Sequence, residues 1–158
     1  MKEINTYDVY GKKYVADIDK LNLSVHIYGI VINDGKILIS PQYDGFDFPG
    51  GTAKIGETHI ETLIREVKEE TGYIVEPIKI LNMYTSYFHH YKTNKDYQSY
   101  LIYYLAKIVD GKISDDGFDE DEKEYAKMAK WVDINELKLM KQASSIKNID
   151  ELLSMIIN

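Results

Sequence analysis

Three glutamates on one predicted helix are the residues of this chain best suited to chemistry. Glu66, Glu69 and Glu70 follow an i, i+3, i+4 spacing, which places their carboxylates on one arc of a helix, roughly 100° wide. Three like charges held so close repel one another, and the arrangement is costly unless a cation lies among them. Because carboxylate oxygens are preferred ligands of hard cations, the spacing predicts a Mg²⁺ or Mn²⁺ site.

The helix that carries these glutamates is predicted for residues 58–71. Thr58 and Glu61 match a capping box, in which each side chain satisfies a free backbone N–H group at the helix start. Gly72 follows as the C-terminal cap. Apolar residues recur at i, i+3, i+4 and i+7, at Ile60, Leu63, Ile64 and Val67. This stripe is centred roughly 120° around the helix from the carboxylates. We therefore expect one side of the helix to pack on a core while the glutamates project into an adjacent cleft.

The other segments predict a sheet that would support this helix. Strands are expected at residues 23–32, 36–40, 74–88 with an interruption at Pro77, 97–109 and 129–132. Helices are expected at residues 135–140 and 149–157, and loops at residues 89–96 and 114–124. The sequence contains no repeat and no linker that would separate two domains. We expect a single domain over residues 1–158, with a hairpin extension at 1–20, a core at about 23–140 and a C-terminal helix at about 147–157.

Composition excludes several classes of protein. The 158 residues include no cysteine, which rules out disulfides, thiolate metal sites and a cysteine nucleophile. The first twenty residues lack the apolar core of a signal peptide, and no apolar run reaches the length of a membrane span. We therefore expect a cytoplasmic protein without a membrane partner. A formal charge of −7 disfavours binding to duplex nucleic acid, but a small phosphorylated substrate remains compatible because bound Mg²⁺ supplies positive charge locally.

The glutamates belong to a longer pattern with fixed spacing. Its members are Gly51, Glu57, Arg65, Glu66, Val67, Glu69, Glu70 and Gly72. Over Gly51–Tyr73 this pattern resembles the Nudix box, the signature of the Nudix hydrolases. Tyr73 stands where the family pattern ends in a small aliphatic residue, and we expect that difference to affect packing and not chemistry. Outside the box, Phe48–Gly51 and Trp131–Val132 also match family features.

The resemblance implies a fold and a reaction. The fold would be of the α+β class, a Nudix-type α/β/α sandwich with a mixed β-sheet between helices. The reaction would be hydrolysis, dependent on a divalent metal, of the pyrophosphate bond in a nucleoside diphosphate linked to another group. The residue types suit that chemistry, because metal ions offset the charge of the phosphates and a carboxylate can take a proton from water.

The resemblance also assigns the metal ligands. Carried over by position, Glu66, Glu69 and Glu70 hold Mg²⁺ or Mn²⁺, and the main-chain carbonyl of Gly50 is a further ligand. One of the glutamates acts as the general base, and Glu66 is favoured over Glu69. A last acidic ligand comes from the segment before the final strand, where the candidates are Asp115, Asp116, Asp119, Glu120, Asp121, Glu122 and Glu124. Glu124 is chosen among them because it lies nearest to the strand around Trp131.

The remaining motif residues have supporting roles. Arg65 is spaced four residues from both Glu61 and Glu69, so we expect it to orient carboxylates through charge-assisted hydrogen bonds. Glu57 is expected to anchor the loop before the helix, and a contact between Glu57 and a metal ion is left open. Gly51 and Gly72 complete the motif.

Substrate identity is less determined than the reaction class. A (deoxy)nucleoside triphosphate or modified nucleotide is favoured by elimination. Family members that act on ADP-ribose often carry a proline beyond the box, and in this chain that region contains Tyr87 and no proline. A dinucleoside polyphosphate is an alternative, because some members that cleave one carry a tyrosine near the position of Tyr91. Both tyrosines are therefore predicted substrate contacts.

Two other functions are compatible with the fold. A non-catalytic nucleotide sensor is disfavoured by the intact acidic residues, and a related isomerase of isoprenoid diphosphates uses a cysteine that this chain lacks. Many family members are homodimers, which leaves a homodimer open here.

Overall fold

The computed structural model describes residues 1–157 and contains a mixed β-sheet. The strands are β1 (Glu3–Tyr7), β2 (Lys13–Asp17), β3 (Asn22–Asn33), β4 (Lys36–Gln42), β5 (Gly45–Asp47), β6 (Gly50–Thr52), β7 (Tyr73–His90), β8 (Lys95–Gly111) and β9 (Lys130–Asp133). They follow the order β2-β1-β7-β8-β3-β4-β5, with β6 paired to β3 and β9 paired to β4. The central pair, β3 and β8, is parallel, whereas β7 and β8 are antiparallel.

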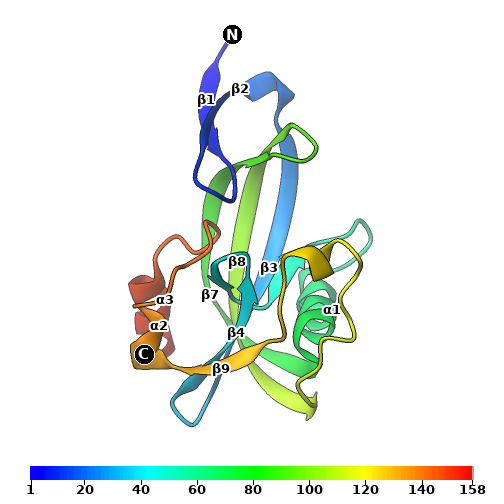
Figure 1. The fold of residues 1–158 in the computed structure, drawn as a ribbon, viewed down its shortest axis with the longest axis vertical. Helices are drawn as coiled ribbons and strands as arrows, with labels where there is room; N and C mark the ends of the chain where they lie inside the picture. Colours follow the sequence, from blue (N-terminus) through cyan, green and yellow to red (C-terminus); the bar gives the residue numbers. More distant parts are fainter. Residues whose placement is uncertain (158) are drawn as a thin grey trace.

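Helices cover both faces of this sheet (Figure 1). The helices are α1 (His59–Thr71), α2 (Ile134–Leu137) and α3 (Ile149–Ile157), and two short 3₁₀ turns are η1 (Ile18–Lys20) and η2 (Glu122–Glu124). On one face, Leu63 and Val67 of α1 pack into a buried cluster with Ile27 of β3. On the other, Leu152 of α3 packs into a cluster with Tyr103 of β8. The α+β sandwich expected from the sequence is confirmed.

Helix α1 forms as its sequence predicts. The Thr58 hydroxyl accepts a hydrogen bond from the Glu61 backbone N–H, and the Glu61 carboxylate accepts one from the Thr58 N–H, which completes the capping box. Gly72 ends the helix in a left-handed conformation, with a φ of 81°. Ile60, Leu63 and Val67 of the apolar stripe pack against the sheet, and their burial fixes the direction in which the glutamates project.

Other elements depart from expectation at their ends. Strands β7 and β8 extend to His90 and from Lys95, so half of the predicted loop 89–96 belongs to strands and the connection is reduced to residues 91–94. A tight turn explains this, because the Asn94 N–H donates to the His90 carbonyl. The ladder of β7 shifts register between Pro77 and Lys79, as expected for a residue that cannot donate a ladder hydrogen bond. The predicted helix at 135–140 is shorter and spans Ile134–Leu137.

The N-terminal hairpin extends the same sheet (Figure 1). Strand β1 meets β7 where Tyr7 pairs with Phe88. The contact is reinforced by the Asp96 carboxylate, which accepts a hydrogen bond from Thr6 at 2.6 Å and contacts the ring of His89 at 2.9 Å. None of the helices within residues 1–157 combines the length and apolar character needed to cross a lipid bilayer.

Candidate metal and active site

Arg65 joins the loop before α1 to the glutamates of the helix. Its Nε donates to Glu57 Oε1 at 2.5 Å, and its Nη1 donates to Glu66 Oε1 at 2.8 Å and to Glu69 Oε2 at 3.2 Å. Its Nη2 donates to the carbonyl of Thr52 at 3.1 Å. The planar guanidinium thus holds three carboxylates in fixed directions. Glu61, which shares the spacing of Glu69, is not among these partners because it caps the helix instead.

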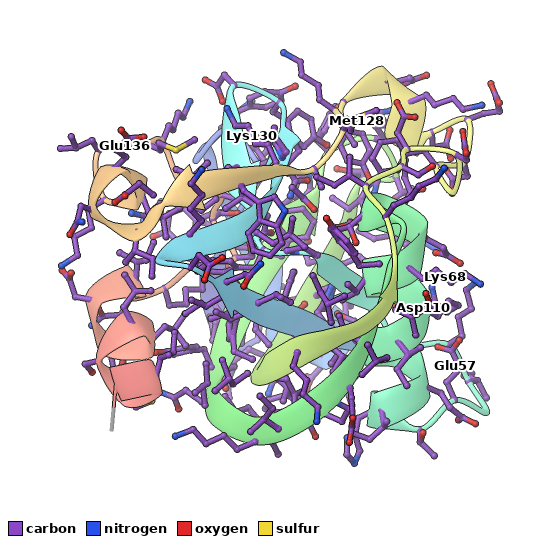
Figure 2. The ribbon with its side chains drawn as sticks, turned by 90° about the horizontal axis from the view of Figure 1, so that it is seen from below. Glu57, Lys68, Asp110, Met128, Lys130 and Glu136 are labelled. Carbon is purple, nitrogen blue, oxygen red and sulfur yellow. The ribbon has the colours of Figure 1, made fainter. Side chains whose placement is uncertain are left out.

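Glu57 anchors the loop that precedes α1, and Figure 2 shows it beside this helix. Besides Arg65, its carboxylate accepts hydrogen bonds from the Thr62 hydroxyl and from the Lys54 backbone N–H, each at 3.0 Å. Hydrogen bonds from Arg65, Lys54 and Thr62 lower the pKa of Glu57 to about 2. Glu57 therefore stays ionised at neutral pH.

Three carboxylates come together to form what we call the glutamate cluster: Glu66 and Glu70 from α1, and Glu122 from η2. Each offers an oxygen within 4.8 Å of the others. Glu66 is buried, with 7% of its surface exposed. Burial is the main reason that the pKa values of all three are raised. The cluster therefore gathers negative charge where water solvates it poorly.

Two neighbours fix Glu70 within the cluster. Its Oε2 accepts a hydrogen bond from the hydroxyl of the buried Ser40 at 2.8 Å, and one from the Gly50 backbone N–H at 3.2 Å. Gly50 itself has a φ of 157°, and a Cβ there would lie 2.2 Å from the Ile27 carbonyl oxygen. Only glycine fits at this position, so β6 can approach both β3 and the cluster.

The cluster fits a hard divalent cation. Its donor set consists of carboxylate oxygens, which suit Mg²⁺ and Mn²⁺. Gly51 leaves room for the carboxylate of Glu66, because a Cβ at this position would lie 2.6 Å from Glu66 Oε2. The three carboxylates lie close together and their pKa values are raised, and a bound cation would relieve the repulsion between them.

Glu122, and not Glu124, joins the helix glutamates. Glu124 points elsewhere, forming an ion pair with Lys92 at 2.8 Å with 63% of its side chain exposed. The reason is geometric: residues two apart on a 3₁₀ turn are separated by roughly 240° around its axis, so both cannot face the cluster. Glu122 is also held by Asp119, whose carboxylate accepts its backbone N–H at 2.8 Å.

The other predicted site residues are only partly brought together. Glu69 contacts Arg65 but lies outside the cluster, and its side chain is 36% exposed. Gly50 reaches Glu70 through its N–H group. Tyr91 does not line the cavity of the cluster but a neighbouring one, together with Tyr10 and Tyr125.

Tyr87 lies on the other face of β7 from Ser86 and Phe88. Those two residues line a cavity beside the cluster, and side chains alternate along a strand, so Tyr87 is turned away from it.

A cavity of about 410 Å³ opens beside the glutamate cluster, and all three of its members line it. The wall also includes Lys54, Gly50 and Gly51. Sequence reasoning did not single out Ser40, because a serine in a strand carries no distinctive signal. Glu122 was one of the candidates in the acidic run. The sequence alone did not show which of these acids faces the helix, because that depends on the 3₁₀ turn η2.

Comparison with known proteins agrees with this geometry. The family model described as NUDIX domain matches residues 21–153. An ADP-ribose pyrophosphatase of Methanocaldococcus jannaschii is 30% identical over 154 residues, covering 85% of this chain and 82% of that protein.

Solved structures show the same fold. A crystal structure of an ADP-ribose pyrophosphatase from Streptococcus suis superposes with a TM-score of 0.61 at 15% identity, covering 85% of this chain and 90% of that one. A solution structure of the Escherichia coli ORF135 protein gives a TM-score of 0.63 at 17% identity, covering 90% and 94%.

The chain belongs to the NUDIX family. This confirms the identification of a Nudix pyrophosphohydrolase that the motif had suggested.

Proposed function

We propose that the protein hydrolyses the pyrophosphate bond of a nucleoside diphosphate linked to a second group, and that Mg²⁺ or Mn²⁺ is required. The observation that carries the proposal is the glutamate cluster, whose three carboxylates line one cavity. In this proposal Glu66, Glu70 and Glu122 hold the metal, together with the carbonyl of Gly50. A divalent cation bound there supplies positive charge against the charge of the phosphates.

Glu66 is proposed as the general base. Its carboxylate lines the cavity beside the glutamate cluster, whereas that of Glu69 does not. Glu66 would accept a proton from the attacking water as the water oxygen bonds to one phosphorus. The bridging P–O bond then breaks and leaves its electron pair on the departing phosphate. Arg65 fixes the direction of the Glu66 carboxylate through the 2.8 Å hydrogen bond, and Glu69 is proposed to share that positioning through Arg65.

Two substrate classes follow from different observations. ADP-ribose is favoured by the relative that covers most of both chains. A (deoxy)nucleoside triphosphate or modified nucleotide is the class expected from sequence.

A dinucleoside polyphosphate is a third possibility, supported by a group of tyrosines near Tyr91. The rings of Tyr10 and Tyr91 lie 5.6 Å apart and those of Tyr43 and Tyr125 stack at 4.9 Å. Tyr43 and Tyr125 also line the cavity of the glutamate cluster, so a second base held there would adjoin the scissile bond.

The proposal is tested with a panel of ADP-ribose, nucleoside triphosphates and dinucleoside polyphosphates, assayed for product release with Mg²⁺. Glu66→Gln is expected to lower kcat on the best substrate by roughly 10²-fold or more. Glu76→Gln is the matched control, because Glu76 pairs with Lys107 at the surface, away from the cavity. Wild-type activity in Glu66→Gln would refute the assignment of the base. Failure of the wild type to hydrolyse any compound would refute the proposed function.

A further inference from the structure

The segment that carries Glu122 differs from the element that carries the other two members of the glutamate cluster. Glu66 and Glu70 lie on α1, a helix of 13 residues. Residues 112–129 instead connect β8 to β9 and contain η2, a turn of three residues. A 3₁₀ turn of that length has little stability of its own. Contacts with other parts of the chain must therefore hold Glu122 in place beside α1.

One such contact is a stack of two tyrosine rings, which we call the tyrosine stack. Tyr125 follows η2, and Tyr43 lies in the turn between β4 and β5. Their ring centroids are 4.9 Å apart and the ring planes differ by 6°. The Tyr43 N–H also donates a hydrogen bond to the Tyr125 carbonyl at 2.8 Å. The stack and the backbone bond together fix the end of η2 against β4.

Tyr43 adopts a backbone conformation that is costly for a residue with a side chain. Its φ is 50°, in the left-handed region that glycine favours. A two-residue turn between antiparallel strands calls for such a conformation, and glycine is a usual residue there. Tyrosine therefore adds a cost to this turn, and what it supplies in return is the ring of the stack. Strained backbone of this kind is concentrated at functional sites.

Tyr125 is connected to Glu122 by short backbone hydrogen bonds. The Glu122 carbonyl accepts one from the Tyr125 N–H at 3.1 Å and another from the Ala126 N–H at 2.8 Å. Tyr125 and Glu122 also line the same cavity. Burial raises the pKa of the Tyr125 hydroxyl, and the charges of Glu122 and Glu70 raise it further. The ring thus lies close to the cluster, and the direction of Glu122 depends on where Tyr125 is held.

The other contacts of this segment act less directly on Glu122. An ion pair between Lys92 and Glu124 at 2.8 Å joins η2 to the turn between β7 and β8. Its side chains are 45% and 63% exposed, and a pair so exposed contributes little to stability. The Lys127 N–H donates to the Pro41 carbonyl at 2.9 Å, which fixes the chain further toward β9. The tyrosine stack is therefore the contact that we expect to direct Glu122.

We propose that Tyr43 and Tyr125 are positioning residues that hold Glu122 within the glutamate cluster. The inference rests on the proposed function, because it concerns the third carboxylate of the metal site. Tyr43 fixes Tyr125, and Tyr125 fixes the turn that presents Glu122. The affinity of the cluster for a divalent cation then depends on two rings that do not themselves bind it.

The test measures the Kd of Mn²⁺ by electron paramagnetic resonance, on protein without nucleotide, so that contacts with substrate play no part. Tyr125→Leu loses the ring stack and is expected to raise the Kd by about tenfold or more. Tyr125→Phe keeps the ring and should stay within about twofold of wild type. The matched control is Tyr14→Leu, because Tyr14 stacks on His89 at 3.7 Å and lines none of the cavities near the cluster. It should keep the wild-type Kd.

Two further variants separate positioning from a general loss of stability. Tyr43→Gly removes the ring but relieves the left-handed backbone, so the fold should be kept while the Kd of Mn²⁺ rises. In a Glu122→Gln background, Tyr125→Leu should raise the Kd no further, since the stack acts through Glu122. Thermal melting without metal checks that each variant is folded.

Three outcomes overturn the inference and leave the proposed function intact. The first is a wild-type Kd in Tyr43→Gly or in a folded Tyr125→Leu. The second is a Kd in Tyr125→Phe as weak as that in Tyr125→Leu, and the third is an undiminished effect of Tyr125→Leu in the Glu122→Gln background. A wild type that binds no Mn²⁺ is a different result, because it refutes the metal site on which the proposed function rests.

Discussion

Replacing Gly51 by alanine separates the geometry of the site from the stability of the fold. The added Cβ would lie 2.6 Å from Glu66 Oε2, whereas ordinary contacts begin at 3.4 Å, so the carboxylate must move by about 0.8 Å. Displacement of a catalytic group by about 1 Å can cost roughly 10²-fold in rate. We therefore expect kcat to fall by about that factor.

The free energy of unfolding should change little in the same variant. Only the end of the flexible Glu66 side chain must move, at a cost of about 0.5–1.5 kcal/mol for a strained rotamer. Replacing glycine also restricts the unfolded chain, which returns about 0.4–1 kcal/mol. The two effects nearly cancel, so Tm should stay within a few degrees of wild type.

The assay measures kcat with Mg²⁺ and Tm for Gly51→Ala beside Gly50→Ala. In Gly50→Ala the Cβ would meet backbone, the Ile27 carbonyl oxygen at 2.2 Å and the Tyr28 Cα at 2.6 Å, which cannot give way cheaply. That variant should lose at least about 2 kcal/mol of stability. A Gly51→Ala enzyme with wild-type kcat, or one as destabilised as Gly50→Ala, would refute the reasoning.

Three further outcomes are expected. Glu122→Gln should lower kcat/KM, and weaken the response of the rate to Mg²⁺, by about tenfold or more. Glu124→Gln should keep both quantities within about twofold of wild type. Similar values for the two variants would contradict the choice of Glu122. Ser40→Ala should raise the Mg²⁺ concentration needed for half-maximal rate by about 10–100-fold, because Glu70 loses a donor at 2.8 Å, and an unchanged Mg²⁺ titration would argue against this. Burial raises the pKa of Asp47 from 3.8 to about 7. Between these values the folded protein keeps a proton that the unfolded chain releases. The stability that this group contributes therefore falls as the pH rises from about 4 to 7. Asp47→Asn should flatten that part of the curve of Tm against pH, and a slope equal to wild type would count against it.

Sequence predicted the elements that local chemistry determines. The capping box at Thr58 and the cap at Gly72 set the ends of α1, and its apolar stripe set which face is buried. The positions of Glu66 and Glu70 on the cavity side follow from that stripe. Fixed spacing within one helix is a short-range property, which explains why a sequence pattern placed these two residues. Glu69, predicted from the same spacing, lies outside the cluster because its carboxylate accepts from Arg65 at the exposed side of the helix.

Contacts between distant segments were less accessible. Glu122 meets the helix only because a 3₁₀ turn directs it inward and directs Glu124 toward Lys92. Ser40 reaches Glu70 across thirty residues of chain. Residues 141–143 likewise lie beside β5 through backbone hydrogen bonds that no local pattern indicates.

The central claim is that Glu66, Glu70 and Glu122 share one divalent cation. The most direct measurement is the anomalous signal of Mn²⁺ soaked into a crystal of the wild-type protein. We expect an ion in contact with an oxygen of each glutamate, at about 2.0–2.2 Å as for hard cations of this size, and its loss in Glu66→Gln. An ion bound elsewhere, or three carboxylates that stay without one at millimolar Mn²⁺, would contradict the account.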